Sequence, residues 1–159
     1  RRDPALPPPV TPHLTAHGPA GARRGERSMS ATRRATVAIV DDDASVRVSL
    51  RRLCEVFGLS ATAYASGREL LESLDGEASR TDCLLLDAHM PEMNGLELQR
   101  HLVMRGVHIP TIICTAGDAP AASAHGAATD VVEYLRKPVS AADLLAAIER
   151  ALRGREPSP

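Results

Sequence analysis

The chain has 159 residues, enough for one domain with some excess, and only 2% of them are aromatic. We therefore expect a single, aliphatic core. No run of about 18 apolar residues occurs and no basic start leads into an apolar stretch, so we expect neither a membrane span nor a signal peptide. This indicates a cytoplasmic protein, in which Cys54, Cys83 and Cys114 are reduced core thiols.

The formal net charge of −1 hides an uneven distribution. Residues 1–35 hold seven Arg against two acidic residues, whereas the remainder carries a balance of −6. The first segment is rich in Pro and lacks apolar periodicity, which predicts a disordered tail. It could be a basic interaction arm, a solvated extension, or sequence upstream of a natural start at Met29, and we assign it no function. Residues 154–159 are also predicted to be disordered.

From residue 36 onward, short apolar runs alternate with segments of helical periodicity. Four such runs predict strands over residues 36–41, 82–87, 110–115 and 131–136, and residues 60–64 are expected to form a short, weak strand. The intervening segments predict five helices, over residues 44–57, from Ser66, over 95–105, over 119–128, and from Ser140. This (βα)₅ order predicts an α/β fold over residues 36–153, a doubly wound parallel sheet with helices on both faces. We adopt the flavodoxin-like strand order 2-1-3-4-5.

Local signals support several of these helix ends. Asp43 can cap the first helix, and Gly58 stands where a left-handed residue would end it. Ser66 with Glu69 forms a capping-box pattern. The segment over residues 119–128 is rich in Ala and has few large apolar side chains, so we expect it to pack weakly.

Four of the predicted strands end in polar groups. In open α/β sheets the ligand site lies beyond the carboxyl ends of the strands, and strands 1 and 3 are neighbours in this order. Asp41, Asp42 and Asp87 should then form an acidic pocket, which suits a hard cation such as Mg²⁺. Thr115 and Lys137 could hold phosphoryl oxygens beside it. Alternatively, the acidic run could serve only as a helix N-terminus.

Lys137 is the only lysine among the 19 Lys and Arg residues of the chain. A lysine ammonium is a compact point charge, whereas an arginine guanidinium is planar and larger. A chain this biased toward Arg has kept Lys at one strand end, directly before Pro138. This favours a specific role in a tight phosphate site over a surviving surface residue.

Residues 36–153 resemble a response-regulator receiver domain, the phosphoacceptor module of two-component signalling. The matching segments, which follow one another in the family's order, are Val40 to Asp43 with Val46-Arg47, Leu86 to Gly95, Cys114 to Ala116, and Tyr134 to Pro138. The turn from Gly117 to Pro120 resembles the nitrogen-fixation type of receiver, which normally precedes a DNA-binding module.

The resemblance implies a role for each residue of the pocket. Asp87 would be the nucleophile that takes phosphate from a phosphohistidine. Asp42 would bind Mg²⁺ directly and Asp41 mainly through water, while the backbone carbonyl of His89 would supply a further oxygen. The His89 side chain could also tune dephosphorylation.

The resemblance also implies a switch. Thr115 and Lys137 would hold the phosphoryl oxygens, and Tyr134 would turn inward when Thr115 moves toward them. Tyr134 could instead be an ordinary core residue.

The implied donor is a sensor histidine kinase or phosphotransfer protein, and the implied receiver of the signal is a protein target. A homodimer through the last helix and strand is an option, and we expect no direct DNA binding because no helix-turn-helix follows. We expect a signalling protein that shows only self-phosphorylation and slow autodephosphorylation, rather than an enzyme.

Two alternatives remain open. The first is a receiver-fold adaptor that is not phosphorylated. The second is a phosphatase of the haloacid-dehalogenase type, because Asp41 to Ser45 faintly resembles the Asp-x-Asp start of that family. Such enzymes need a further acidic motif after the lysine, and here only Asp143 and Glu149 follow.

Overall fold

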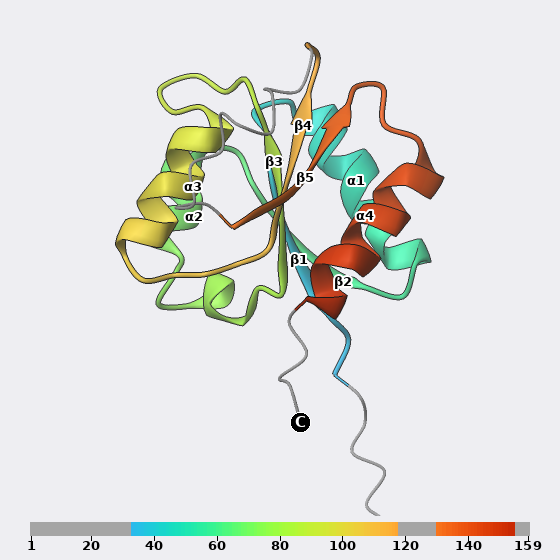
Figure 1. Cartoon of the computed structure of the whole chain (residues 1–159), viewed down its shortest axis with the longest axis horizontal. Coiled ribbons are helices and arrows are strands. Elements are labelled where there is room, and N and C mark those ends of the chain that lie inside the picture. The colour runs from blue at the N-terminus through green and yellow to red at the C-terminus, as the bar shows by residue number, and fades with distance from the viewer. Residues whose placement is uncertain (1–32, 118–129, 155–159) are drawn as a thin grey trace, which may run out of the picture. The chain divides into compact units, whose positions relative to one another are not determined.

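A five-stranded parallel sheet forms the centre of the domain. The computed structural model describes residues 33–117 and 130–154. The strands are β1 Thr36–Val40, β2 Ser60–Tyr64, β3 Cys83–Asp87, β4 Thr111–Thr115 and β5 Val131–Arg136. Their order in the sheet is β2-β1-β3-β4-β5, and every neighbouring pair is parallel. The predicted fold class and strand order are therefore confirmed (Figure 1).

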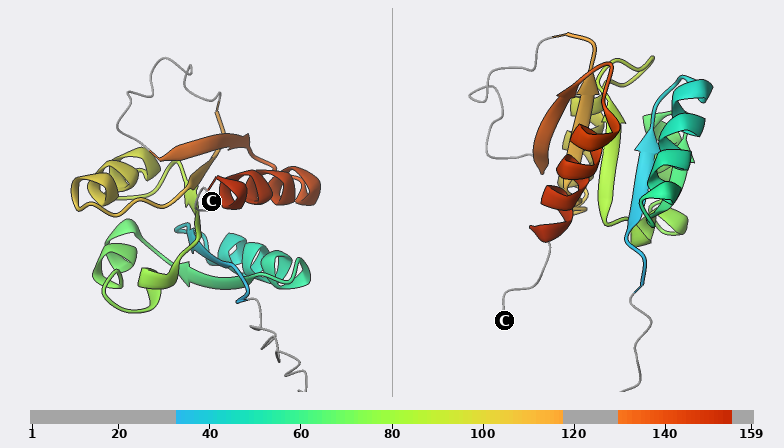
Figure 2. Two further views of the ribbon diagram at one scale, coloured as in Figure 1. Left: turned by 60° about the horizontal axis from the view of Figure 1, so that its bottom comes forward. Right: turned by 90° about the vertical axis from the view of Figure 1, so that its right-hand side faces the viewer.

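Helices cover both faces of this sheet (Figures 1 and 2). Those described are α1 Ala44–Val56, α2 Gly67–Glu72, α3 Gly95–Met104 and α4 Ala141–Arg153. Helices α1 and α4 lie on one face, and α2 and α3 on the other. The helix predicted over residues 119–128 falls outside the described residues.

The alternation of side chains along each strand divides the core into two clusters. From β1, Val37 and Ile39 join the cluster that packs under α1 and α4. Ala38 and Val40 join the cluster under α2 and α3. Because β1 and β3 are covered on both faces, their residues read as continuous apolar runs in the sequence, as expected for central parallel strands.

The predicted caps start the helices as expected. The Asp43 carboxylate accepts from the backbone N–H groups of Ser45 and Val46, and Gly58 adopts φ +76° after α1. Ser66 caps α2 through the N–H of Glu69, but the Glu69 carboxylate accepts from Ala65 rather than from Ser66. The capping box predicted at α2 is therefore displaced by one residue.

Some features were not predicted. A short 3₁₀ helix at Glu77–Arg80 precedes β3. A complete capping box between Asn94 and Glu97 starts α3. Arg33, which we placed in the tail, forms an ion pair with Asp82 at 2.8 Å.

The three thiols are buried and free, as predicted.

None of the helices in the described ranges is long and apolar enough to cross a membrane.

Candidate functional site

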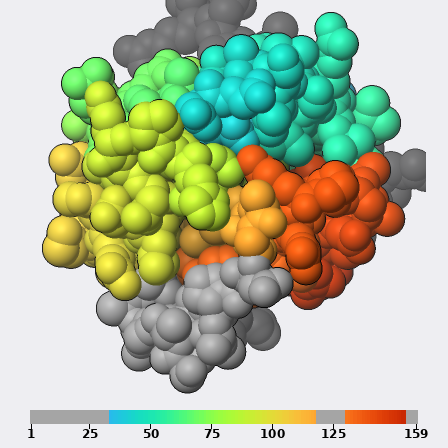
Figure 3. Space-filling model, turned by 90° about the horizontal axis from the view of Figure 1, so that it is seen from above, coloured from blue at the N-terminus to red at the C-terminus, as the bar shows by residue number. Residues whose placement is uncertain are grey.

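The four polar strand ends meet at one edge of the sheet. Asp41 directly follows β1, Asp87 is the last residue of β3, Thr115 is the last of β4, and Lys137 directly follows β5. In register, Val40 lies opposite Leu86, Asp87 opposite Cys114, and Thr115 opposite Arg136. In the view onto this edge, the segments that follow these strands lie next to one another (Figure 3).

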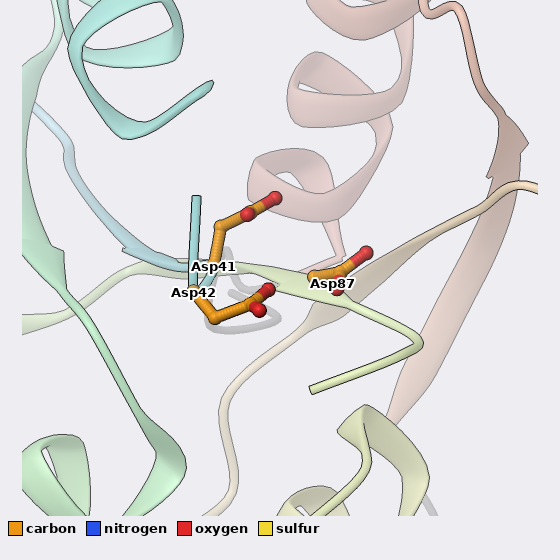
Figure 4. Close-up of side chains that lie close together, drawn as sticks. All are labelled: Asp41, Asp42 and Asp87. Carbon is orange, nitrogen blue, oxygen red and sulfur yellow. The ribbon is translucent and has the colours of Figure 1, made fainter. Parts of the chain in front are cut away.

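Asp41, Asp42 and Asp87 form an acidic cluster at this edge. One carboxylate oxygen from each lies within 4.8 Å of those of the other two. Asp41 and Asp42 extend from the end of β1 beside Asp87 of β3 (Figure 4). Asp41 is 3% exposed and Asp87 7%, whereas Asp42 is open to solvent. Two buried carboxylates and one exposed one form an oxygen-rich pocket of the kind that suits Mg²⁺, which keeps several waters and takes few protein ligands.

Lys137 offsets part of the charge of the two buried carboxylates. Its Nζ donates to Asp87 Oδ1 at 2.7 Å and to Asp41 Oδ2 at 3.2 Å. Burial disfavours the charged ammonium, but the hydrogen bond to Asp87 and the charges of Asp41 and Asp87 outweigh this cost, so the pKa of Lys137 is raised. The predicted link between Lys137 and the acidic pocket is thus a direct double ion pair.

Several hydrogen bonds hold the loop that follows β1. The Asp41 N–H donates to the carbonyl of Tyr64 at 3.3 Å, and the Asp43 N–H donates to Asp41 Oδ1 at 2.9 Å. The Arg47 guanidinium donates to the carbonyl oxygens of Asp41 and Asp42, at 2.7 and 3.0 Å. Arg47 belongs to the sequence motif, but its contact with the loop was not predicted.

The backbone of Asp87 is closely covered by the start of α3. A Cβ atom at Gly95 would lie 2.5 Å from the Asp87 carbonyl oxygen. The Gly95 N–H donates to the carbonyl of Ala88, and the Ala88 N–H donates to that of Cys114. Position 95 therefore requires glycine, and this close approach fixes the chain around Asp87.

Thr115, His89 and Tyr134 line a second cavity next to the acidic cluster. It has a volume of about 280 Å³ and is completed by Ala88, Asn94, Leu96 and Ile113. Thr115 is buried, and its Oγ1 accepts from the Gly117 N–H at 3.2 Å. Tyr134 is half-buried. Burial raises the pKa of Tyr134, and the charge of Arg100 offsets part of this effect.

The carboxyl edge of the sheet holds five of the predicted residues, Asp41, Asp42, Asp87, Thr115 and Lys137, whereas Tyr134 lies within β5. The structure brings Asp41, Asp42, Asp87 and Lys137 into one charged cluster. It places Thr115, His89 and Tyr134 together beside that cluster rather than within it. Pro138 follows Lys137 through a cis peptide bond.

Comparison with known proteins identifies this arrangement. The sequence model described as the response regulator receiver domain matches residues 37–149, which include the whole acidic cluster and Lys137. The chain belongs to the response-regulator receiver family.

Individual relatives agree with this assignment. Nodulation protein W of Bradyrhizobium diazoefficiens is 37% identical over 131 residues, which cover 79% of this chain and 56% of that protein. Response regulator MprA of Mycobacterium leprae is 38% identical over 118 residues, 74% of this chain and 51% of that protein. A receiver domain structure from Clostridium thermocellum has a TM-score of 0.67 and 30% identity, covering 76% of this chain and 96% of that one.

The chain spans about half the length of these two curated relatives. The receiver match supports a role in two-component signalling. The activities of the longer relatives belong to those proteins.

Proposed function

We propose that this receiver domain accepts a phosphoryl group on Asp87 and thereby switches its conformation to signal to a protein partner. The observation that carries the proposal is the pairing of Asp87 with Lys137 within a cluster of three carboxylates. Such a site combines a nucleophilic oxygen, an ammonium and potential metal ligands within one small volume. The same features argue against an adaptor that is never phosphorylated.

The proposed donor is the phosphohistidine of a sensor histidine kinase or a phosphotransfer protein. A carboxylate oxygen of Asp87 attacks the phosphorus, a P–O bond forms, and the P–N bond to the donor imidazole breaks. The imidazole nitrogen keeps the bonding electron pair, and the proton on the other ring nitrogen makes it a neutral leaving group. The product on this chain is an acyl phosphate.

Several residues would assist this transfer. Asp42 and Asp87 would bind Mg²⁺ directly, Asp41 mainly through water, and the backbone carbonyl of His89 would add another oxygen. When bound, Mg²⁺ supplies positive charge that offsets the charge of the phosphoryl oxygens. Lys137 already contacts Asp87, and it would follow the new phosphoryl oxygens as charge moves onto them.

Thr115 and Tyr134 would convert this local change of charge into a change in the surface that a partner binds. Both line the cavity of about 280 Å³ beside the cluster, so movement of the Thr115 hydroxyl toward the phosphoryl group would open space for the Tyr134 ring. Such coupling of a modification to a two-state side chain is a general switching device. The readout would be the binding of a protein target or a second copy of the domain.

Acetyl phosphate and intact-mass measurement test this proposal. With Mg²⁺, the wild-type chain should gain the mass of one phosphoryl group, and Asp87→Asn should gain none. The adduct should also fail to form when EDTA removes the metal. An adduct on both proteins, or on neither, would overturn the proposal. Steady turnover of p-nitrophenyl phosphate would favour the phosphatase alternative instead.

A further inference from the structure

The Arg47 side chain folds back from the first turn of α1 onto the loop that carries the acidic pair. Its own N–H donates to the carbonyl of Asp43 at 3.0 Å, which is the first helical hydrogen bond of α1. Its Nη1 donates to the carbonyl oxygen of Asp41 at 2.7 Å and to that of Asp42 at 3.0 Å. One guanidinium group therefore holds two consecutive peptide units of the loop.

The Arg47 guanidinium contacts main-chain oxygens rather than a carboxylate. Within residues 33–117 and 130–154, Arg47 has no ion pair with a carboxylate, although Asp41, Asp42 and Asp43 lie close by in the chain. The side chain is half-buried, and two hydrogen bonds direct it at the main chain. Its guanidinium therefore does not neutralise the carboxylates of the loop.

The orientation of a peptide unit and the direction of its side chain are linked through the backbone dihedral angles. With both carbonyls held by Arg47, the Asp41 and Asp42 side chains extend from the loop beside Asp87, where one oxygen from each lies within 4.8 Å of the others (Figure 4). Three carboxylates this close repel one another, and a loop free to rotate would separate them. The Arg47 contact opposes that separation.

We propose that Arg47 is a positioning residue for metal binding, which holds the carbonyls of Asp41 and Asp42 so that their carboxylates stay together for Mg²⁺. This inference rests on the proposed function, because it assumes that the acidic cluster binds Mg²⁺. Groups that orient metal ligands in this way typically change metal affinity by about 10- to 100-fold when removed. Both contacts are made by Nη1, and the compact ammonium of Lys is not interchangeable with the planar guanidinium, so Lys should restore them only in part.

The test is a calorimetric titration of the full chain with Mg²⁺, without phosphodonor. Arg47→Ala should weaken Mg²⁺ binding about tenfold, and Arg47→Lys should give an intermediate affinity. Arg51→Ala is the matched control, because Arg51 lies one turn later on α1 and forms an exposed ion pair with Glu55 at 3.5 Å. The Arg51→Ala protein should bind Mg²⁺ as tightly as the wild type. Saturating Mg²⁺ should restore phosphorylation of Arg47→Ala by acetyl phosphate to nearly the wild-type rate.

Far-UV circular dichroism establishes whether each variant is folded. If Arg47→Ala is unfolded, the Mg²⁺ affinity of Arg47→Lys is compared with that of the wild type instead. A folded Arg47→Ala or Arg47→Lys protein that binds Mg²⁺ as tightly as the wild type would overturn the inference while leaving the proposed function intact. A wild-type chain that does not bind Mg²⁺ would overturn both.

Discussion

Lys137 Nζ lies 2.7 Å from Asp87 Oδ1, although 50 residues separate the two in the chain. The same ammonium donates to Asp41 at 3.2 Å, so a single cation joins the ends of β1, β3 and β5. Before any phosphoryl group arrives, the site therefore already holds a cation that offsets part of the charge of its carboxylates.

Removal of this cation should destabilise the fold. Lys137→Met leaves Asp41 and Asp87 buried and close together without their shared partner, and we expect the free energy of unfolding to fall by about 2 kcal/mol. Urea unfolding measured by circular dichroism checks this value. Arg153→Met is the control, since Arg153 forms an exposed pair with Glu149, and loss of such a pair should cost less than about 0.5 kcal/mol. Equal effects of the two substitutions would contradict the account.

The pH dependence of this contribution follows from the raised pKa of Lys137. A cationic group whose folded pKa exceeds its unfolded value stabilises the fold fully below the unfolded pKa. The ordinary value for lysine is 10.5, so the difference between wild type and Lys137→Met should be constant up to about that pH and shrink above it. A difference that already vanishes near pH 8 would exclude the double ion pair.

The acidic cluster should be a source of instability that Mg²⁺ relieves. Asp42 is exposed and does not contact Lys137 within the described structure, so Asp42→Asn removes one of three mutually repelling charges and leaves the ion pairs in place. We expect a gain of up to about 1 kcal/mol without metal. The increase in melting temperature that Mg²⁺ gives the wild type should largely disappear. Asp75→Asn, at an exposed turn, should change neither quantity.

Gly95 should tolerate no side chain. The Cβ atom of Gly95→Ala would lie 2.5 Å from the carbonyl oxygen of Asp87, and main-chain atoms must move to relieve the contact. We expect a loss of about 2 kcal/mol in unfolding free energy and a slower reaction with acetyl phosphate. Gly154→Ala is the control, because its Cβ would meet its nearest neighbour at 3.7 Å. A Gly95→Ala protein with wild-type stability would show that this close approach is absent in solution.

The buried thiols should make the fold sensitive to alkaline pH. Burial raises the pKa of Cys54 and Cys114 to about 11 and that of Cys83 to about 12, from 9.0. Above pH 9 the unfolded chain therefore ionises first, and stability should fall by up to about 1.4 kcal/mol per pH unit for each thiol. Urea unfolding at pH 7.5, 9 and 10.5 measures this slope, and Cys83→Ala should reduce it.

The reactivity of the thiols tests their burial independently of the unfolding measurements. In the native protein at pH 8, all three should react slowly with Ellman's reagent, and all should react at once in urea. Rapid reaction of the native protein would contradict the burial of these side chains.

Much of the fold follows from sequence patterns alone. The apolar runs define β1, β3 and β4 to within one residue, because central parallel strands must be apolar on both faces. The topology then brings Asp41 and Asp87 together, since strands 1 and 3 are neighbours. Helix starts follow from local capping residues such as Asp43 and Ser66.

The finer geometry of the site could not be predicted in this way. The contact of Arg47 with the loop depends on the rotamer of a long side chain, which tertiary packing selects. The division between the charged cluster and the cavity beside Thr115 depends on the direction of each side chain beyond its strand end. The sequence predicts which residues share an edge of the sheet, but not which of their side chains touch.

The most direct measurement is to locate the phosphoryl group by chemical trapping. After reaction with acetyl phosphate and Mg²⁺, borohydride reduces an aspartyl phosphate to homoserine, and peptide mapping identifies the changed residue. The tryptic peptide over residues 81–100 holds both Asp82 and Asp87 and so provides an internal control. The account predicts homoserine at position 87 alone, dependent on Mg²⁺. Trapping at Asp41, Asp42 or Asp82, or no trapping in the wild type, would contradict it.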